Sequence, residues 1–258
     1  MSVTWGAVTE RGLRRPVNED AMVADPPVFA VADGMGGHAA GDVASRLTID
    51  CLADLVGHGP IGAPDVIDAV SAANRCILDV ASQDRERAGM GTTLSGLAMV
   101  SAGGLEHWMV FNIGDSRVYR LADGHLAQLT VDHSEVEELL AAGRLTQTEA
   151  RSYPRRNVVT RSLGSEPIGA LDSWVFPPAG GERFLICTDG LTEEVEDIAI
   201  GDCLTTIDDP QRAAEWLVEQ ALAAGARDNV TVLVVDSAAP QAGAAADEDT
   251  FPRRSHGS

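Results

Sequence analysis

The chain has 258 residues, enough for one large domain or two small ones, and its 45% hydrophobic and 22% charged residues are an ordinary balance for a globular protein. Its 39 acidic and 19 basic residues give a net charge of −20, which repels nucleic acid and anionic lipid and attracts divalent cations and basic protein segments. The first residues are polar and no apolar run approaches the ~18–20 residues of a membrane span, so we expect a cytoplasmic protein that binds neither membranes nor nucleic acid.

Several short apolar runs with β-branched residues predict strands. They cover residues 3–8, 28–33, 93–100, 107–113, 117–121, 183–189 and 230–236. The segment 107–130 is typical of a hairpin or meander, with turns expected at Gly114-Asp115-Ser116 and at Ala122-Asp123-Gly124.

Three segments with apolar residues at every third or fourth position predict amphipathic helices. They lie at 42–56, 65–81 and 211–224, and the last should be capped by Asp208 or Asp209, with Pro210 in its first turn and Gly225 at its end. Helices and strands do not alternate regularly along the chain, so a parallel doubly wound sheet is not favoured.

Two regions differ from this pattern. Residues 132–170 are polar, carry two short helical patterns and lack strong strands, which indicates an inserted flap or small helical subdomain. The residues from about Ser237 onward are rich in Ala, Gly, Pro and acids and have no apolar face. We therefore expect one domain over 1–237, with the flap at about 132–170, and a disordered tail over 238–258.

Aspartates stand at the ends of several predicted strands, namely Asp20, Asp33, Asp115, Asp189 and Asp228. A single Asp-Gly pair is most simply explained as a turn. Several buried carboxylates without cationic partners are costly, however, and together they predict a cation site. The four cysteines are widely spaced and form no cluster with histidine, so oxygen ligands and Mg²⁺ or Mn²⁺ are favoured over zinc.

The loop after residues 28–33 offers a competing interpretation. Gly34, Gly36 and Ala39 satisfy the G-x-G-x-x-[GA] dinucleotide fingerprint, which would indicate a nucleotide-binding oxidoreductase. Asp33 would repel a pyrophosphate at this position, and no repeating βαβ pattern follows, so this interpretation is the weaker one.

Seven short motifs occur in order along the chain. They are RPVNED at 15–20, VADGMGGH at 31–38, GTT at 91–93, IGDSRVYR at 113–120, LTVDHS at 129–134, CTDGL at 187–191 and ARDNVTV at 226–232. In this order the chain, from about Val3 to Asp236, resembles the metal-dependent Ser/Thr protein phosphatases of type 2C in their bacterial single-domain form. The resemblance implies an α+β fold, a four-layer α-β-β-α sandwich with two antiparallel sheets face to face, helices outside and a small helical flap.

The resemblance also implies a set of metal ligands. Asp33 would bridge two Mn or Mg ions, and the Gly34 carbonyl would bind one of them. Asp20 would hold one ion, and Asp189 and Asp228 would hold the other.

Further roles follow from the same resemblance. Glu19 would act through metal-bound water, and Asp115 together with Asp189 would bind a weaker third ion. Arg15 would bind the substrate phosphate in a forked geometry. A hydroxide shared by the metal ions would attack phosphorus in line, without a phosphoenzyme. His38 is a candidate general acid, although a structural role in its loop is the simpler interpretation.

The implied function is hydrolysis of phosphoserine and phosphothreonine in proteins by a monomeric enzyme that reverses Ser/Thr kinase signalling. Its partners would be phosphorylated proteins, including Ser/Thr kinases and their substrates. The alternative is a catalytically silent pseudophosphatase that binds a kinase or phosphoprotein, although no expected ligand residue is missing. The flap has Tyr153 where the family pattern has histidine, and its Arg155, Arg156 and Arg161 either meet the phosphosubstrate or form a solvated face.

Overall fold

The strands form two antiparallel sheets, and the computed structural model describes residues 2–36, 40–168 and 170–238. Sheet A contains, in spatial order, β1 (Val3–Glu10), β11 (Val230–Ser237), β10 (Arg183–Cys187), β7 (Arg117–Ala122) and β8 (His125–Gln128). Sheet B contains β2 (Asp20–Asp25), β3 (Val28–Met35), β5 (Leu94–Ala102), β6 (Leu105–Ile113) and β9 (Asp172–Phe176), and the short β4 (Gly91–Thr92) pairs with β3.

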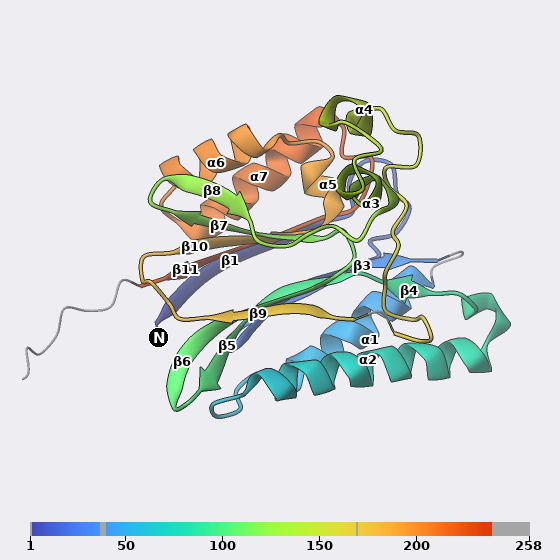
Figure 1. The fold of residues 1–258 in the computed structure, drawn as a ribbon, viewed down its shortest axis with the longest axis horizontal. Coiled ribbons are helices and arrows are strands. Elements are labelled where there is room, and N and C mark those ends of the chain that lie inside the picture. Colours follow the sequence, from blue (N-terminus) through green and yellow to red (C-terminus); the bar gives the residue numbers. More distant parts are fainter. Residues whose placement is uncertain (1, 37–39, 169, 239–258) are drawn as a thin grey trace, which may run out of the picture.

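Helices cover the outer face of each sheet, as Figure 1 shows. Helices α1 (Gly41–Ala53) and α2 (Ala63–Gln83) lie on sheet B, whereas α6 (Asp197–Thr206) and α7 (Pro210–Ala224) lie on sheet A. The shorter helices are η1 (Arg85–Arg87), α3 (Glu135–Ala141), α4 (Gln147–Arg151) and α5 (Asp189–Thr192). The expected four-layer α-β-β-α sandwich is therefore confirmed.

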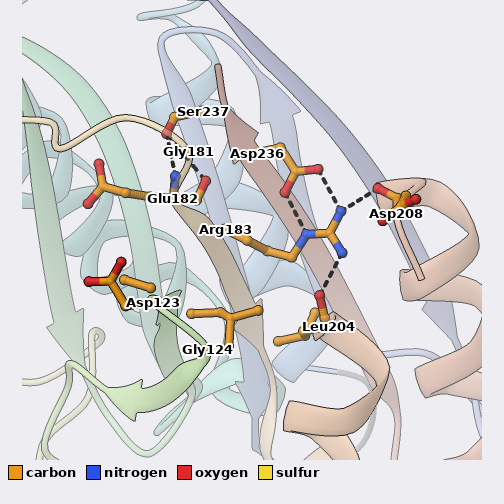
Figure 2. A pocket seen from close by; sticks show the side chains of 11 residues that line it. Asp123, Gly124, Gly181, Glu182, Arg183, Leu204, Asp208, Asp236 and Ser237 are labelled. Atoms are coloured by element: carbon orange, nitrogen blue, oxygen red, sulfur yellow. Dashed lines mark hydrogen bonds and ion pairs between the residues drawn. The ribbon is translucent and has the colours of Figure 1, made fainter. Parts of the chain in front are cut away.

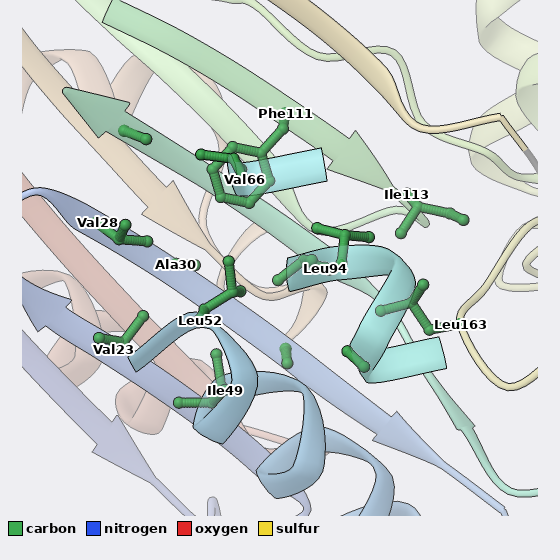
Figure 3. Packing of buried hydrophobic residues seen from close by; sticks show 14 of the residues in the cluster. Val23, Val28, Ala30, Ile49, Leu52, Val66, Leu94, Phe111, Ile113 and Leu163 are labelled. Atoms are coloured by element: carbon green, nitrogen blue, oxygen red, sulfur yellow. The ribbon is translucent and has the colours of Figure 1, made fainter. Parts of the chain in front are cut away.

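The central strands of each sheet are buried on both faces, which explains why they read as continuous apolar runs. In β3, Phe29 and Val31 belong to the cluster between the two sheets. Their neighbours Val28, Ala30 and Ala32 belong to the cluster between sheet B and its helices, part of which is seen in Figure 3. Strands β10 and β11 alternate in the same way between the inner cluster and the helices of sheet A.

The predicted helices are present with small differences at their ends. Of the two candidate caps for the last helix, Asp209 is the one used, because its side chain accepts a hydrogen bond from the Arg212 amide at 2.8 Å. Gly225 ends this helix with a φ of 126°, a conformation that favours glycine. The predicted strand 183–189 stops at Cys187, since Asp189 already begins α5.

The prediction of a meander over 107–130 is wrong in its first half. Asp123 and Gly124 do form the turn of the β7–β8 hairpin. Strand β6, however, pairs with β5 and β9, whereas β7 pairs with β10 and β8. The Gly114-Asp115-Ser116 turn therefore carries the chain from sheet B to sheet A, and Gly114 makes the change of direction at a φ of 113°.

The flap region contains the two short helices that its sequence predicts, α3 and α4. Isolated bridges join Ser134 to Val159 and Thr92 to Leu163. The predicted disordered tail falls, apart from Ala238, outside the described residues. Within the described ranges, no helix is both long and apolar enough to cross a membrane.

Candidate active site

Strand pairing brings the strand-end aspartates together at one end of the sandwich. Asp20 and Asp33 are cross-strand partners on β2 and β3 of sheet B. Asp189 follows β10, and Asp228 precedes β11, its neighbour in sheet A. The carboxylates of both sheets lie within electrostatic reach, because Asp20, Asp189, Asp115 and Asp228 all act on the charge of Asp33.

Burial and mutual repulsion raise the pKa values of Asp20, Asp33, Asp115 and Asp189. Burial raises the pKa of Asp20 to about 7 and that of Asp115 to about 6. The pKa values of Asp33 and Asp189 rise well above the ordinary range, first because of burial and then because of neighbouring carboxylates. A cluster of this kind needs either protons or bound cations to offset its charge.

Two of the carboxylate oxygens are left unpartnered. Asp20 Oδ2 accepts hydrogen bonds from the hydroxyls of Thr188 at 2.9 Å and Thr231 at 2.7 Å. Asp20 Oδ1 and Asp189 Oδ1 are buried without a hydrogen-bond partner among the described residues. Buried polar atoms are rarely left unsatisfied, and hard carboxylate oxygens suit Mg²⁺ or Mn²⁺. The donor set therefore fits the divalent cations that the sequence predicts.

The same side chains are not arranged as a finished metal cage. In the part of the chain that the structure describes, no three Asp, Glu, His or Cys side chains come close enough to hold an ion. Asp228 Oδ2 instead accepts a hydrogen bond from Arg15 Nη2 at 2.5 Å. Rotation of a side chain can complete a cage, and a buried carboxylate oxygen without a partner is costly, so the arrangement still favours a cation site.

Arg15 lies at the mouth of this cluster on a loop that a buried asparagine holds in place. Its side chain is 46% exposed, and its hydrogen bond to Asp228 raises the pKa of the guanidinium. Asn229 Nδ2 donates to the carbonyls of Arg11 at 2.8 Å and Val17 at 3.0 Å, on either side of Arg15. The loop is therefore fixed while the guanidinium can reach an anion beside the aspartates.

Glu19 is anchored through its backbone. Its amide donates to Asn229 Oδ1 at 2.8 Å, and its carbonyl accepts from the Gly34 amide at 3.2 Å and the Ser45 hydroxyl at 2.6 Å. Burial raises the pKa of its carboxyl group, and Arg15 acts in the opposite direction.

The GTT motif holds the backbone of Asp33. The Asp33 carbonyl accepts from the Thr93 amide at 2.9 Å and from the Thr92 hydroxyl at 2.8 Å, and the Asp33 amide donates to Thr93 Oγ1 at 3.0 Å. At Gly34 a Cβ atom would lie 2.2 Å from the carbonyl oxygen of Gly41. Glycine is therefore required here by the close packing of β3 on the start of α1, independently of any ligand.

Asp115 lies in the turn that crosses between the sheets and is 9% exposed. The preceding Gly114 is fixed by His133, whose Nδ1 accepts from the Gly114 amide at 3.0 Å and whose own amide donates to the Gly114 carbonyl at 2.9 Å. The His133 carbonyl in turn accepts from the Thr160 amide at 2.8 Å. His133 thus links the Asp115 turn to the flap. His38, the candidate general acid, lies outside the described residues.

The flap arginines are engaged with acidic partners. Arg155 lies 2.7 Å from Glu135, Arg161 lies 3.5 Å from Asp172, and Arg156 lies 3.9 Å from Glu193. The Tyr153 hydroxyl also donates to Glu135, at 2.7 Å. These pairs offset the local positive charge, which weakens the interpretation of the flap as a phosphate-binding surface.

Several residues near the site were not singled out from the sequence. They are Thr188 and Thr231, which bind Asp20, Thr92 and Thr93, which hold Asp33, and Asn229, which holds the Arg15 loop. All five stand inside the GTT, CTDGL and ARDNVTV motifs, so their presence in these motifs was the available signal.

A hollow of about 370 Å³ lies at the end of sheet A opposite to the aspartate cluster and is shown in Figure 2. Arg183 lines this hollow, but all five of its N–H donors already form hydrogen bonds. Nε and Nη2 bind the Asp236 carboxylate at 2.6 and 2.7 Å, Nη1 binds the carbonyls of Leu204 at 2.8 Å and Ile207 at 2.5 Å, and Nη2 also binds the Asp208 carbonyl. Arg183 therefore ties the end of β11 to α6, and this hollow offers no free guanidinium donor to a ligand.

Comparison with known proteins gives the same picture from sequence and from structure. The Ser/Thr protein phosphatase PstP of Mycobacterium tuberculosis is 41% identical over 239 residues, which are 90% of this chain and 44% of PstP. This chain therefore spans less than half the length of that relative. The Ser/Thr phosphatase stp of Listeria monocytogenes is 34% identical over 246 residues, which are 91% of this chain and 96% of that protein.

Solved structures agree with these sequence matches. A crystal structure of M. tuberculosis PstP superposes with a TM-score of 0.84 at 40% identity, covering 92% of this chain and 99% of the other. The PstP catalytic domain in complex with two manganese ions gives a TM-score of 0.82 at 38% identity, covering 92% and 98%. The protein phosphatase 2C family model matches residues 16–228. The chain belongs to the protein phosphatase 2C family of Ser/Thr protein phosphatases.

Proposed function

We propose that this chain is an active enzyme that hydrolyses phosphoserine and phosphothreonine in proteins with two bound Mn or Mg ions. The main support is the aspartate cluster at the end of the sandwich. Its carboxylates repel one another, and the Oδ1 atoms of Asp20 and Asp189 are buried without a partner among the residues that the structure describes. Such a site is stabilised by divalent cations.

In this proposal the ions are held by Asp20, Asp33, Asp189 and Asp228, with the Gly34 carbonyl as a further ligand. When bound, two divalent cations supply positive charge to the phosphoryl oxygens and lower the pKa of water. The chain itself supplies the geometry. The hydroxyls of its threonines orient Asp20, and the hydrogen bonds of the GTT motif fix the backbone of Asp33.

Arg15 is the residue that we assign to the substrate phosphate. Its guanidinium is partly exposed and stands on a loop that Asn229 holds. To bind a phosphoryl group it would release Asp228 Oδ2, which becomes free at the same time to bind a cation. A planar guanidinium can donate two parallel hydrogen bonds to phosphoryl oxygens, which a lysine cannot do.

Other assignments follow from the positions of Glu19, Asp115 and His38. Glu19 lies beside Arg15 and would position water near the ions. Asp115 lies close enough to Asp189 to raise its pKa, and we propose that the two carboxylates bind a weaker third ion. We retain His38 as a candidate general acid on the sequence alone.

We further propose that the partners are phosphorylated proteins, including Ser/Thr kinases and their substrates, and that the enzyme acts as a monomer in the cytoplasm. The names of the relatives support the first part, since they are Ser/Thr protein phosphatases. The net charge of −20 argues against nucleic acid and anionic membranes as partners.

The alternative is a pseudophosphatase that binds phosphoproteins without turnover. A missing ligand would favour it, but each residue that the family resemblance assigns to the two principal ions is present in this sequence. We therefore prefer the active enzyme.

The test is turnover of p-nitrophenyl phosphate and of a phosphothreonine peptide by the purified chain, with Mn²⁺, with Mg²⁺ and with EDTA. We expect hydrolysis with the metals and none with EDTA, and recovery when excess Mn²⁺ is added back. Activity that survives complete metal removal would contradict the proposed mechanism. Phosphopeptide binding without turnover in Mn²⁺ would identify a pseudophosphatase.

A further inference from the structure

A groove of about 540 Å³ leads away from the aspartate cluster. Asp115 and Asp189 form its inner end. One wall comes from the flap, including Leu140 of α3, and the other from the segment between α5 and α6 and the start of α6, including Ile198. If a phosphorylated residue binds at the aspartate cluster, the neighbouring part of its own chain therefore lies along this groove.

The lining of the groove is strongly acidic. Seven acidic side chains line it against three arginines. Two of these arginines already have acidic partners, because Arg117 forms a bidentate pair with Asp132 at 2.9 and 2.6 Å and Arg156 lies 3.9 Å from Glu193. The negative charge of the groove is therefore in excess.

Two acidic groups on the walls that are unpaired among the described residues contribute to this excess. Glu137 of α3 and Glu196, the N-cap residue of α6, lie on opposite walls, and neither forms an ion pair with another described residue. The groove also offers an apolar contact, because the side chain of Ile198 is 76% exposed. These features match a cationic segment with an aliphatic stem, such as that of arginine or lysine.

We propose that this groove binds the part of the substrate next to its phosphorylated residue and selects segments that carry arginine or lysine. The inference rests on the proposed phosphatase function and adds a substrate class to it. Glu137 and Glu196 are the specificity-determining residues, and acidic segments are rejected because they would meet like charge.

The experiment compares phosphothreonine peptides with an otherwise uncharged sequence. Two residues beside the phosphothreonine are varied as Arg-Arg, Ala-Ala or Glu-Glu, in one series before it and in another after it. The readout is the ratio of kcat/KM for the Arg peptide to that for the Glu peptide, since a general loss of activity lowers both values. We expect a ratio of about ten in at least one series at low salt, shrinking toward one at high salt.

Charge variants of the groove test which residues are responsible. The double variant Glu137→Gln/Glu196→Gln should lower the ratio about three- to tenfold. The double variant Glu137→Lys/Glu196→Lys should reverse the preference in favour of the Glu peptide. The matched control is Asp68→Asn/Asp79→Asn, which removes two exposed charges from α2, in the helical layer on sheet B, and should leave the ratio unchanged.

Two measurements separate failure of this inference from failure of the proposed function. If p-nitrophenyl phosphate is hydrolysed but the ratio is one in both series, the groove assignment is wrong and the phosphatase assignment stands. If p-nitrophenyl phosphate is not hydrolysed in Mn²⁺, the phosphatase assignment is wrong. Fluorescence anisotropy of labelled Arg and Glu phosphopeptides then decides on the groove, and equal affinities for the two would overturn it.

Discussion

Asp189 is the residue whose environment makes the clearest prediction. Its carboxylate lies among like charges and has a buried oxygen that finds no hydrogen-bond partner in the described part of the chain. Asp189→Asn removes a proposed metal ligand, so turnover in Mn²⁺ should fall at least about 100-fold, which is the upper end of the loss seen for residues that only orient a ligand. It also removes a repelled charge, so the free energy of unfolding in EDTA should rise by about 1 kcal/mol or more.

Urea denaturation in EDTA and turnover of p-nitrophenyl phosphate measure the two effects of Asp189→Asn. Asp68→Asn on α2 is the control and should change neither quantity by much. If Asp189→Asn lowered activity and stability together, Asp189 would have a structural role and not the role proposed here.

Thr231 tests whether the hydroxyls around Asp20 position it for a cation. Its Oγ1 donates to Asp20 Oδ2 at 2.7 Å and also lies 2.8 Å from Thr9 Oγ1. Thr231→Val keeps the shape of the side chain but removes the hydroxyl, so the Mn²⁺ concentration needed for half-maximal activity should rise about tenfold. Activity as a function of Mn²⁺ concentration, together with calorimetric Mn²⁺ binding, measures this change.

The control for the threonine prediction is Thr205→Val on α6, whose exposed hydroxyl donates to the Gly201 carbonyl of its own helix at 2.7 Å. It should leave the Mn²⁺ dependence unchanged. A loss of maximal rate in Thr231→Val with unaltered Mn²⁺ dependence would speak against a positioning role.

At the residue scale, the sequence predicted the acidic residues of the site but not the residues that hold them in place. Asp33 and Asp189 stand out because an apolar run ends on each of them. The roles of Thr188 and Thr231 could not be read in the same way, since their hydroxyls reach Asp20 only because sheet A packs against sheet B at that point. A hydroxyl contact between two sheets leaves no periodic signal along either strand.

At the scale of elements, the turn between β6 and β7 is the feature that a sequence pattern misjudged. Two neighbouring strands with a Gly-containing turn between them favour a hairpin. The pairing depends instead on the partner strands, and β6 and β7 each find partners in a different sheet. The buried residues of each strand pack on both faces of its sheet, so their apolar periodicity carries no information about which sheet each strand joins.

The crossover turn makes a prediction about stability. Gly114 has a φ of 113°, and a Cβ atom there would lie 2.5 Å from the side chain of Thr93, which holds Asp33. Gly114→Ala should therefore lower the free energy of unfolding by about 2–4 kcal/mol, because backbone strain is added to a steric clash.

Gly124→Ala provides the matched control for Gly114→Ala. Gly124 also has a positive φ, 74°, but its Cβ would meet no atom within 4 Å, so only backbone strain of about 1 kcal/mol is expected. Urea denaturation of both variants separates the two contributions. Equal losses would show that the contact with Thr93 is unimportant.

At the scale of the whole molecule, the sandwich explains both the apolar strands and the location of the acidic site. Alternate residues of β3, β10 and β11 pack between the sheets or under the helices, so every side chain of the continuous apolar run in such a strand is buried. The acidic side chains of the site stand at strand ends, whereas buried polar residues inside strands, such as Ser95 and Asn112, bond to each other. The carboxylates converge at one such end, where partial burial raises the pKa values of several of them.

These raised pKa values predict how the stability of the metal-free protein depends on pH. Burial raises the pKa of Asp20 to about 7 and that of Asp115 to about 6, whereas an aspartate in an unfolded chain titrates near ~4. As the pH rises from about 4 to above 7, the unfolded chain releases these protons before the folded protein does. Stability should therefore be greatest at the acidic end of this window and fall through it by an amount on the order of a few kcal/mol.

Comparison of the wild type with Asp20→Asn separates the pH dependence of stability that is due to Asp20 from the pH dependence that is due to the other charged groups. The net charge of −20 also makes the folded protein more stable at lower pH, and the variant keeps all of this charge except that of Asp20. The stability of the variant in EDTA should therefore decline less steeply between pH 5 and pH 8. Thermal or urea unfolding at these two pH values gives the slopes. Adding Mn²⁺ at pH 8 should restore stability to the wild type, because an ion that binds only the folded state shifts the equilibrium toward it. Identical slopes in the wild type and the variant would mean that Asp20 is already ionised in the folded protein at pH 5 and that its burial is offset by the hydroxyls of Thr188 and Thr231 alone.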